Sequence, residues 1–243
     1  SLANVMEEGY EVERYAYKLF PDGRIATDGK NTKKLMKDGG VIFQPVITSG
    51  ELYCRADIIS YDKNSEAWDI FEVKSSTQEK NIHEYDLSFQ KFVFEKAGYK
   101  VGKLNLIHIN NEYVKHGEID VKELFKIEDI TNEVKELSQE TKEQVKVLSE
   151  ILKRRNEPSV RPVKQCNNPY ECMFKEYCLQ GIPPKSIYSI IGKLSEKTIN
   201  KLLDDEILEI ENIPEEYITE RFSKHFHAIK YDVVSIDKEE IKS

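Results

Sequence analysis

Long hydrophobic runs are absent from this chain of 243 residues. No apolar stretch approaches the roughly 20 residues that a membrane-spanning helix needs, so we expect no membrane partner. The first four residues are followed by charge and do not resemble a signal peptide. We therefore expect an intracellular, cytoplasmic protein. The chain begins at Ser1 instead of Met, which suggests that it is a fragment of a longer protein.

Positive charge is also scarce. Lys and Arg number 36 against 44 Asp and Glu, which gives a net charge of −8. Because phosphate contacts dominate nucleic-acid affinity, binding by this chain would need a local basic patch and metal ions. Two clusters are candidates, and either could equally be an ordinary solvated face: Lys33, Lys34 and Lys37, or Lys153, Arg154 and Arg155 with Arg161 and Lys164.

A hydrophobic content of 39% with 33% charged residues predicts a globular chain with enough material for a core. Its length suits one large domain, or one domain with a small appendage. Residues 68–76 have the composition of a strand, and Glu72 and Lys74 lie two apart on it, so both side chains share one face. This places a carboxylate beside an ammonium group at a strand end.

Residues 51–61 form the preceding predicted strand, and the polar residues 62–66 predict a turn between the two. A turn centred between Asn64 and Ser65 gives an antiparallel hairpin in which Asp57 lies opposite Glu72, with Cβ atoms roughly 4.5–5.5 Å apart. Arg55 would then lie opposite Lys74. With residues 41–48 as a third strand, the hairpin extends to an antiparallel meander.

Two opposed carboxylates repel each other, and a sequence that breaks a local rule in this way often does so at a functional site. A divalent cation such as Mg²⁺ between Asp57 and Glu72 would remove the repulsion. The alternative is a surface hairpin whose charges pair diagonally, Asp57 with Lys74.

Three segments resemble the PD-(D/E)XK nuclease core in its RecB-like exonuclease branch: Arg55-Ala56-Asp57-Ile58, Phe71-Glu72-Val73-Lys74-Ser75-Ser76 and Asp86-Leu87-Ser88-Phe89-Gln90. The resemblance covers residues 5–180. It extends to an uncharacterised bacterial family in which this domain precedes an RNase H-like domain. It implies a restriction-endonuclease-like α/β fold, with a mixed central sheet that contains the antiparallel meander and is flanked by helices.

The resemblance also implies roles for single residues. Asp57, Glu72 and the Val73 carbonyl would hold Mg²⁺ or Mn²⁺, Lys74 would orient the nucleophile, and Gln90 would assist. The branch often brings another ligand from its first helix, here predicted over residues 3–20. Glu13 is the candidate, with a solvated acidic face as the alternative.

The helix predicted over residues 79–97 departs from the branch at one position. RecB-like enzymes carry Gln-x-x-x-Tyr there, but Phe94 stands where the Tyr would be. This puts the role of position 94 in doubt but does not affect the role of Gln90. The alternative for Gln90 is an amide on the helix surface. Residues 101–110 predict a buried strand after this helix, and residues 129–155 predict one long amphipathic helix.

Three cysteines at regular spacing, Cys166, Cys172 and Cys178, suggest a metal or an iron–sulfur cluster. Such sites usually need four ligands, and Cys54 is expected to pack inside the sheet. Cluster-bearing RecB-like nucleases use one N-terminal and three C-terminal cysteines, which implies a [4Fe–4S] cluster whose fourth ligand precedes Ser1. We therefore expect the cluster to be incomplete or absent in this chain. Three unmetallated cysteines are the alternative.

We expect the nuclease domain over residues 1–180 and a small helical extension over residues 181–243. Part of the extension resembles a degenerate helix-hairpin-helix with Gly192 in the hairpin, and plain helical packing is the alternative. The predicted function is a metal-dependent DNA exonuclease. A catalytically silent nucleic-acid-binding scaffold is the second hypothesis, and a structural zinc-binding interaction domain, based on the three cysteines, is the third.

Overall fold

The computed structural model describes residues 2–76, 81–158, 164–167, 170–190 and 194–231. It divides the chain into two compact units, residues 1–154 and residues 155–243. The predicted boundary lay after residue 180, whereas this division falls before the cysteines. Within the described residues, no helix is both long enough and apolar enough to cross a membrane.

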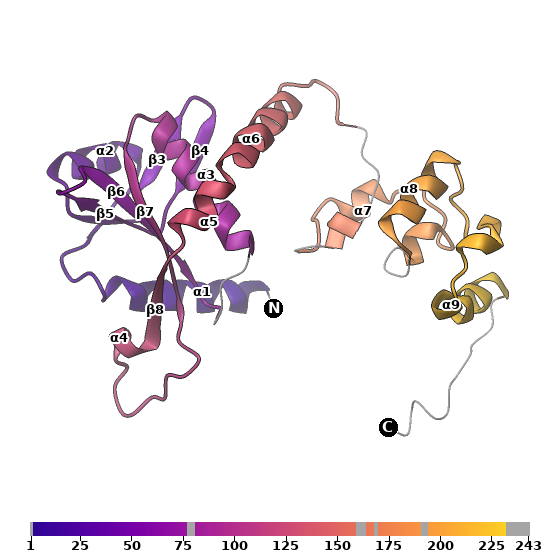
Figure 1. The fold of residues 1–243 in the computed structure, drawn as a ribbon, viewed down its shortest axis with the longest axis horizontal. Helices are drawn as coiled ribbons and strands as arrows, with labels where there is room; N and C mark the ends of the chain where they lie inside the picture. Colours follow the sequence, from indigo (N-terminus) through magenta and orange to yellow (C-terminus); the bar gives the residue numbers. More distant parts are fainter. Residues whose placement is uncertain (1, 77–80, 159–163, 168–169, 191–193, 232–243) are drawn as a thin grey trace. The chain divides into compact units, whose positions relative to one another are not determined.

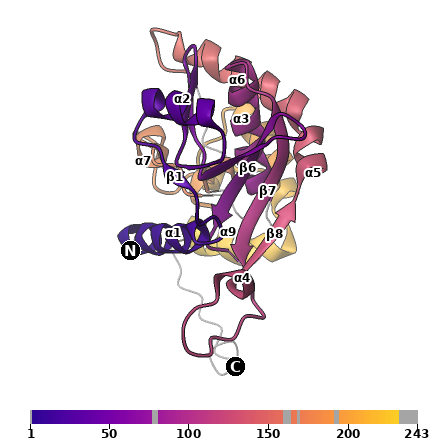
Figure 2. The same ribbon diagram turned by 90° about the vertical axis from the view of Figure 1, so that its left-hand side faces the viewer.

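The first unit is a mixed α/β domain around a six-stranded sheet of order β1-β2-β5-β6-β7-β8. Its strands are β1 (Arg24–Ile25), β2 (Val41–Phe43), β5 (Ile58–Asp62), β6 (Ala67–Lys74), β7 (Val101–Ile109) and β8 (Phe125–Asp129). Strands β2, β5 and β6 form the predicted antiparallel meander, and β7 runs parallel to β6. Figure 2 shows β6, β7 and β8 side by side. The predicted mixed central sheet is confirmed.

Helices cover both faces of this sheet. They are α1 (Leu2–Tyr17), α2 (Gly29–Asp38), α3 (Asn81–Lys96), α4 (Val121–Leu124), α5 (Thr131–Glu136) and α6 (Ser138–Leu152). On one face α3 and α5 pack over Ile59, Ile70 and Leu106, while α1 packs on the other face over Ile58 and Ile107 (Figure 1). Alternate residues of each strand therefore belong to two different cores.

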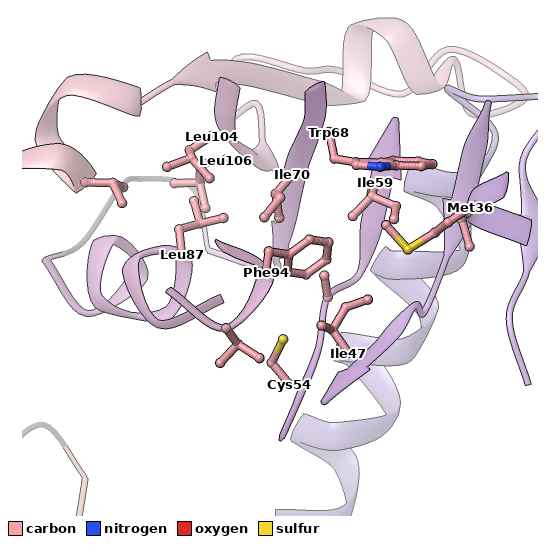
Figure 3. Close-up of a cluster of buried hydrophobic side chains, with 14 of the residues drawn as sticks. Met36, Ile47, Cys54, Ile59, Trp68, Ile70, Leu87, Phe94, Leu104 and Leu106 are labelled. Atoms are coloured by element: carbon pink, nitrogen blue, oxygen red, sulfur yellow. The ribbon is translucent and has the colours of Figure 1, made fainter. Parts of the chain in front are cut away.

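The larger core contains Phe94 of α3, which has no exposed surface. Figure 3 shows its ring among Ile47, Cys54 and Ile70. Cys54 packs in the core as predicted, and burial raises the pKa of its thiol to about 12. This cysteine therefore stays protonated at neutral pH.

The predicted strands 41–48 and 51–61 are each broken in two. After β2 the chain bends and continues as β3 (Val46–Ser49), which pairs with β4 (Leu52–Arg55) in a separate two-stranded sheet. The pairing continues across the bend, because Gln44 N–H donates to Asp57 O and Ala56 N–H donates to Pro45 O. Arg55 consequently pairs with Val46, and the prediction that it lies opposite Lys74 is wrong.

Two further features of this unit differ from what the sequence led us to expect. The helix expected over residues 129–155 is two helices, because α5 ends at Glu136 and α6 begins at Ser138. Strand β8 was not predicted at all. It alternates charged and apolar residues at the edge of the sheet, and Lys126 and Ile127 are both exposed.

The second unit has its own apolar core. Its helices are α7 (Lys175–Cys178), α8 (Glu196–Asp204) and α9 (Glu220–Tyr231), with 3₁₀ turns at Lys164–Asn167, Ile187–Ile190, Ile210–Asn212 and Glu215–Tyr217. Ser195 caps α8 by accepting from the Thr198 N–H. The core includes Leu202 and Phe222, both almost fully buried. Helical segments were predicted here, and Gly192 of the predicted hairpin lies outside the described residues.

Candidate functional site

The hairpin between β5 and β6 brings Asp57 and Glu72 to one end of the sheet. Ile58 pairs with Phe71 and Ile59 with Ile70, the register expected from a turn centred between Asn64 and Ser65. The predicted hairpin register is therefore confirmed from Ile58 onward. Asp57 directly precedes β5, so its position opposite Glu72 follows only by continuing this register one residue beyond these pairs.

Glu72 is buried, with 8% of its surface exposed, on the face that α3 covers. Gln90 of α3 donates from Nε2 to one carboxylate oxygen at 2.6 Å. The other oxygen lies 2.8 Å from Lys74 Nζ. Gln90 is itself buried, so the interpretation as a helix-surface amide is wrong.

Lys74 lies between two carboxylates, because its Nζ is also 2.7 Å from Asp86 Oδ2 of α3. Burial alone would lower the pKa of this ammonium group. Glu72 and Asp86 more than offset that effect and hold its pKa above the ordinary value. Lys74 is therefore charged at neutral pH and held in place by both carboxylates. The diagonal pairing of Asp57 with Lys74 is not observed, since its partners are Glu72 and Asp86.

Asp57 is anchored at the point where β5 begins. Its Oδ2 accepts from the Val73 N–H at 2.8 Å, and its Oδ1 lies 3.4 Å from Gln44 Nε2. Burial raises the pKa of this carboxyl well above its ordinary value, and the charges of Glu72 and Glu13 raise it further. The Val73 N–H opposes the rise. The site thus keeps a carboxyl group where a charge is unfavourable.

Glu13 reaches the same region from α1, the helix on the opposite face of the sheet. Its Oε1 accepts from the Tyr17 hydroxyl and from Gln44 Nε2. Burial, and next the Glu13 carboxylate, raise the pKa of the Tyr17 phenol, so this hydroxyl remains a donor. The Tyr17 ring stacks on Phe43 with centroids 4.0 Å apart, which fixes its position.

The donor set fits a hard divalent cation, although the described residues contain no group of three or more His, Cys, Asp or Glu side chains close enough to hold a metal ion as they stand. Mg²⁺ is usually held by one or two carboxylates together with water and substrate oxygens, and Asp57 and Glu72 supply that number. In addition, the buried Oε1 of Gln90 has no hydrogen-bond partner among the described residues. Opposed carboxylates with one compensating lysine leave an excess of negative charge that a cation would neutralise.

The raised pKa of Asp57 makes the stability of the metal-free protein depend on pH. The folded chain holds the Asp57 proton more tightly than the unfolded chain, whose Asp pKa is about 3.9. The stability from this group is therefore fully present below about pH 4 and is lost as the pH rises through the higher folded pKa. We expect the free energy of unfolding to fall in the wild type relative to Asp57→Asn as the pH rises above about 4, the ordinary Asp pKa.

Trp68 makes this measurement specific, because it is the single tryptophan of the chain and is buried in the larger core of the first unit. Its fluorescence during urea unfolding follows that core alone. Parallel pH profiles for the wild type and Asp57→Asn would contradict the expected titration.

Three residues that contact the predicted set were not predicted as part of the site: Gln44, Asp86 and Tyr17. Asp86 stands one helical turn before Gln90, a spacing that signals a shared face of α3. Tyr17 likewise follows Glu13 by four residues. Gln44 gave no such signal, because its role depends on a bend that the sequence shows only through Pro45.

The three C-terminal cysteines lie in the second unit, with all thiols free. The Cys172 N–H donates to the Cys166 carbonyl at 2.8 Å, and the Cys178 N–H donates to Phe174 O. The first of these hydrogen bonds brings Cys172 beside Cys166, and Cys178 ends the helical turn α7. That these three cysteines hold a metal or an iron–sulfur cluster stays a prediction.

A groove of about 570 Å³ lies on the outer side of α3, beside α5 and α6. Four lysines line it with two glutamates: Lys91, Lys96, Lys135 and Lys142, with Glu95 and Glu136. Phe92 forms part of its wall, and Lys96 Nζ lies 5.7 Å from the centre of that ring. The groove therefore carries local positive charge on an acidic chain, and neither predicted basic cluster contributes to it.

The fold and the site together define a mixed α/β domain with a buried carboxylate–lysine centre at one end of its sheet. Neither the protein-family models nor the curated proteins that were searched give a match to this chain.

Proposed function

We propose that this protein is a metal-dependent nuclease of the PD-(D/E)XK type that hydrolyses phosphodiester bonds, with DNA as the substrate and exonucleolytic action. The observation that carries the proposal is the centre formed by Asp57, Glu72 and Lys74. Asp57 directly precedes β5, Glu72 lies on the neighbouring strand β6, and a charged lysine follows Glu72 with its Nζ 2.8 Å from the Glu72 carboxylate.

Each residue of this centre has a role in the proposed reaction. Asp57 and Glu72 would hold Mg²⁺ or Mn²⁺, with help from the Val73 carbonyl and with Glu13 near Asp57. When bound, such a cation lowers the pKa of water and offsets phosphate charge. Lys74 orients the nucleophile with its ammonium group, and Asp86 fixes that group by the contact of 2.7 Å. Gln90 orients Glu72 through its amide.

The lysine-lined groove supports a nucleic-acid substrate. Binding of a phosphate backbone needs positive charge. Because the net charge of this chain is −8, that positive charge has to come from a local cluster such as this groove. The half-buried ring of Phe92 in the groove wall would add an aromatic group on which a base can stack. We therefore propose that part of the DNA follows α3 along this groove.

The proposal is tested by cleavage of end-labelled single- and double-stranded DNA in Mn²⁺. We expect the wild type to cleave and a chelator to stop it. Lys74→Ala should reduce the rate by about a hundredfold or more, the usual contribution of a positioned proton-handling group. Lys126→Ala is the matched control, because Lys126 is an exposed lysine on β8 whose ion pair with Glu112 is long, 3.5 Å. Full activity of Lys74→Ala would contradict the mechanism.

A second candidate function is a nucleic-acid-binding scaffold without catalysis. It is favoured by the double ion pair of Lys74, which is also what a purely structural buried lysine would show. Mn²⁺ binding separates the two. A nuclease centre should lose its Mn²⁺ affinity in Glu72→Gln, whereas a scaffold should show no affinity that depends on Glu72.

A further inference from the structure

Gln44 connects the two helical layers at the end of the sheet. Glu72 and Gln90 belong to the face that α3 covers, while Glu13 belongs to α1 on the other face. Gln44 stands between β2 and β3, and its Nε2 donates to Glu13 and lies 3.4 Å from Asp57 Oδ1. One amide group therefore links carboxylates that approach the site from opposite sides of the sheet.

Gln44 has an unusual backbone conformation, and this conformation directs its side chain toward the site. Its φ is +53°, in the left-handed region that non-glycine residues rarely adopt, and Pro45 follows it. Among the described residues, two other non-glycine residues have a positive φ, Glu66 and Glu206, and both are exposed. At Gln44 the reversal breaks the strand alternation and turns the side chain toward the two carboxylates.

We propose that Gln44 is a positioning residue that orients Asp57, and holds Glu13 beside it, for a shared divalent cation. This inference rests on the metal centre proposed above. An amide suits the role because its N–H groups satisfy carboxylate oxygens without adding negative charge. The Val73 N–H fixes the other Asp57 oxygen, so the carboxylate is held from both sides. Outer partners of this kind orient metal ligands and commonly change metal affinity by 10–100-fold.

The test is Mn²⁺ titration calorimetry on the full chain. Gln44→Gly removes the amide and keeps the bend, since glycine adopts positive φ without strain. We expect Mn²⁺ affinity to fall by about 10–100-fold, while metal-free unfolding followed by Trp68 fluorescence stays at or above the wild-type midpoint. Glu66→Gly is the matched control, because it relieves the same strain in the β5–β6 turn, and its affinity should not change.

Gln44→Asn provides a second variant, because asparagine also tolerates this conformation but its amide is one methylene shorter. Its affinity should fall as well. Wild-type affinity in Gln44→Gly and Gln44→Asn would overturn the positioning role and leave the metal centre intact. If the wild type binds no Mn²⁺, or binds none that Asp57→Ala removes, both the positioning role and the metal centre are overturned. Binding without DNA cleavage would overturn the nuclease proposal only.

Discussion

Asp57→Asn is expected to reduce metal-dependent cleavage by at least about a thousandfold while making the metal-free protein more stable. The loss follows because a metal ion supplies several kcal/mol of charge stabilisation in the transition state, and each 1.4 kcal/mol is about tenfold in rate. Asparagine keeps the shape of the side chain but lacks the charge that holds a cation. Cleavage in Mn²⁺ and calorimetric Mn²⁺ binding measure the two losses.

The gain in stability follows from the same environment. Burial, Glu72 and Glu13 all disfavour the charged form of Asp57, so the folded protein holds an unfavourable group there when no metal is bound. A neutral asparagine removes this repulsion and can still accept from the Val73 N–H. We expect the free energy of unfolding to rise by about 1 kcal/mol, the size typical of relieving an unfavourable site.

Asp69→Asn is the matched control for this pair of effects. Asp69 lies on β6, three residues before Glu72, and burial raises the pKa of its carboxyl as well. Its Oδ1 accepts from the Lys103 N–H at 2.6 Å, away from the site. We expect Mn²⁺ binding and cleavage to be retained in Asp69→Asn. Cleavage by Asp57→Asn at the wild-type rate would refute the metal role of Asp57.

The core of the site could be predicted from the sequence because it depends on local rules. The polar turn sets the register of the β5–β6 hairpin, and the observed register agrees with the one predicted from that turn. The resemblance to RecB-like enzymes assigned Gln90 to the site, and in the structure Gln90 contacts Glu72 from α3. The hairpin register involves residues joined by one turn, so periodicity is sufficient to find it.

The rest of the site could not be predicted because it depends on a bend shared by two strands. Gln44 and Asp57 face each other where both strands leave the main sheet, and Pro45 was the single local sign of this break. Alternation of side chains fails at such a bend, since Gln44 turns its side chain by adopting a positive φ. Arg55 was predicted opposite Lys74 for the same reason, although β4 carries it into the second sheet.

Phe94→Ala is expected to lower the free energy of unfolding of the first unit by about 3–5 kcal/mol. Phe94 is fully buried in the larger core, one helical turn beyond Gln90, and alanine would leave a cavity among Ile70, Cys54 and Ile47 (Figure 3). Urea unfolding followed by Trp68 fluorescence reports this core directly. Phe92→Ala is the matched control, because Phe92 lies on the groove side of the same helix and is only partly buried.

Phe94→Tyr tests whether position 94 serves the site or the core. The resemblance to RecB-like enzymes would assign a functional tyrosine here, yet the fully buried ring leaves a new hydroxyl group without water. An unsatisfied buried hydroxyl costs about 1–3 kcal/mol, so we expect a lower free energy of unfolding and no gain in cleavage. Faster cleavage by Phe94→Tyr would show instead that position 94 reaches the reacting groups. Gln90, one helical turn before position 94, already donates a hydrogen bond to the Glu72 carboxylate. The side chain at position 94 is therefore not needed for that contact and packs in the core.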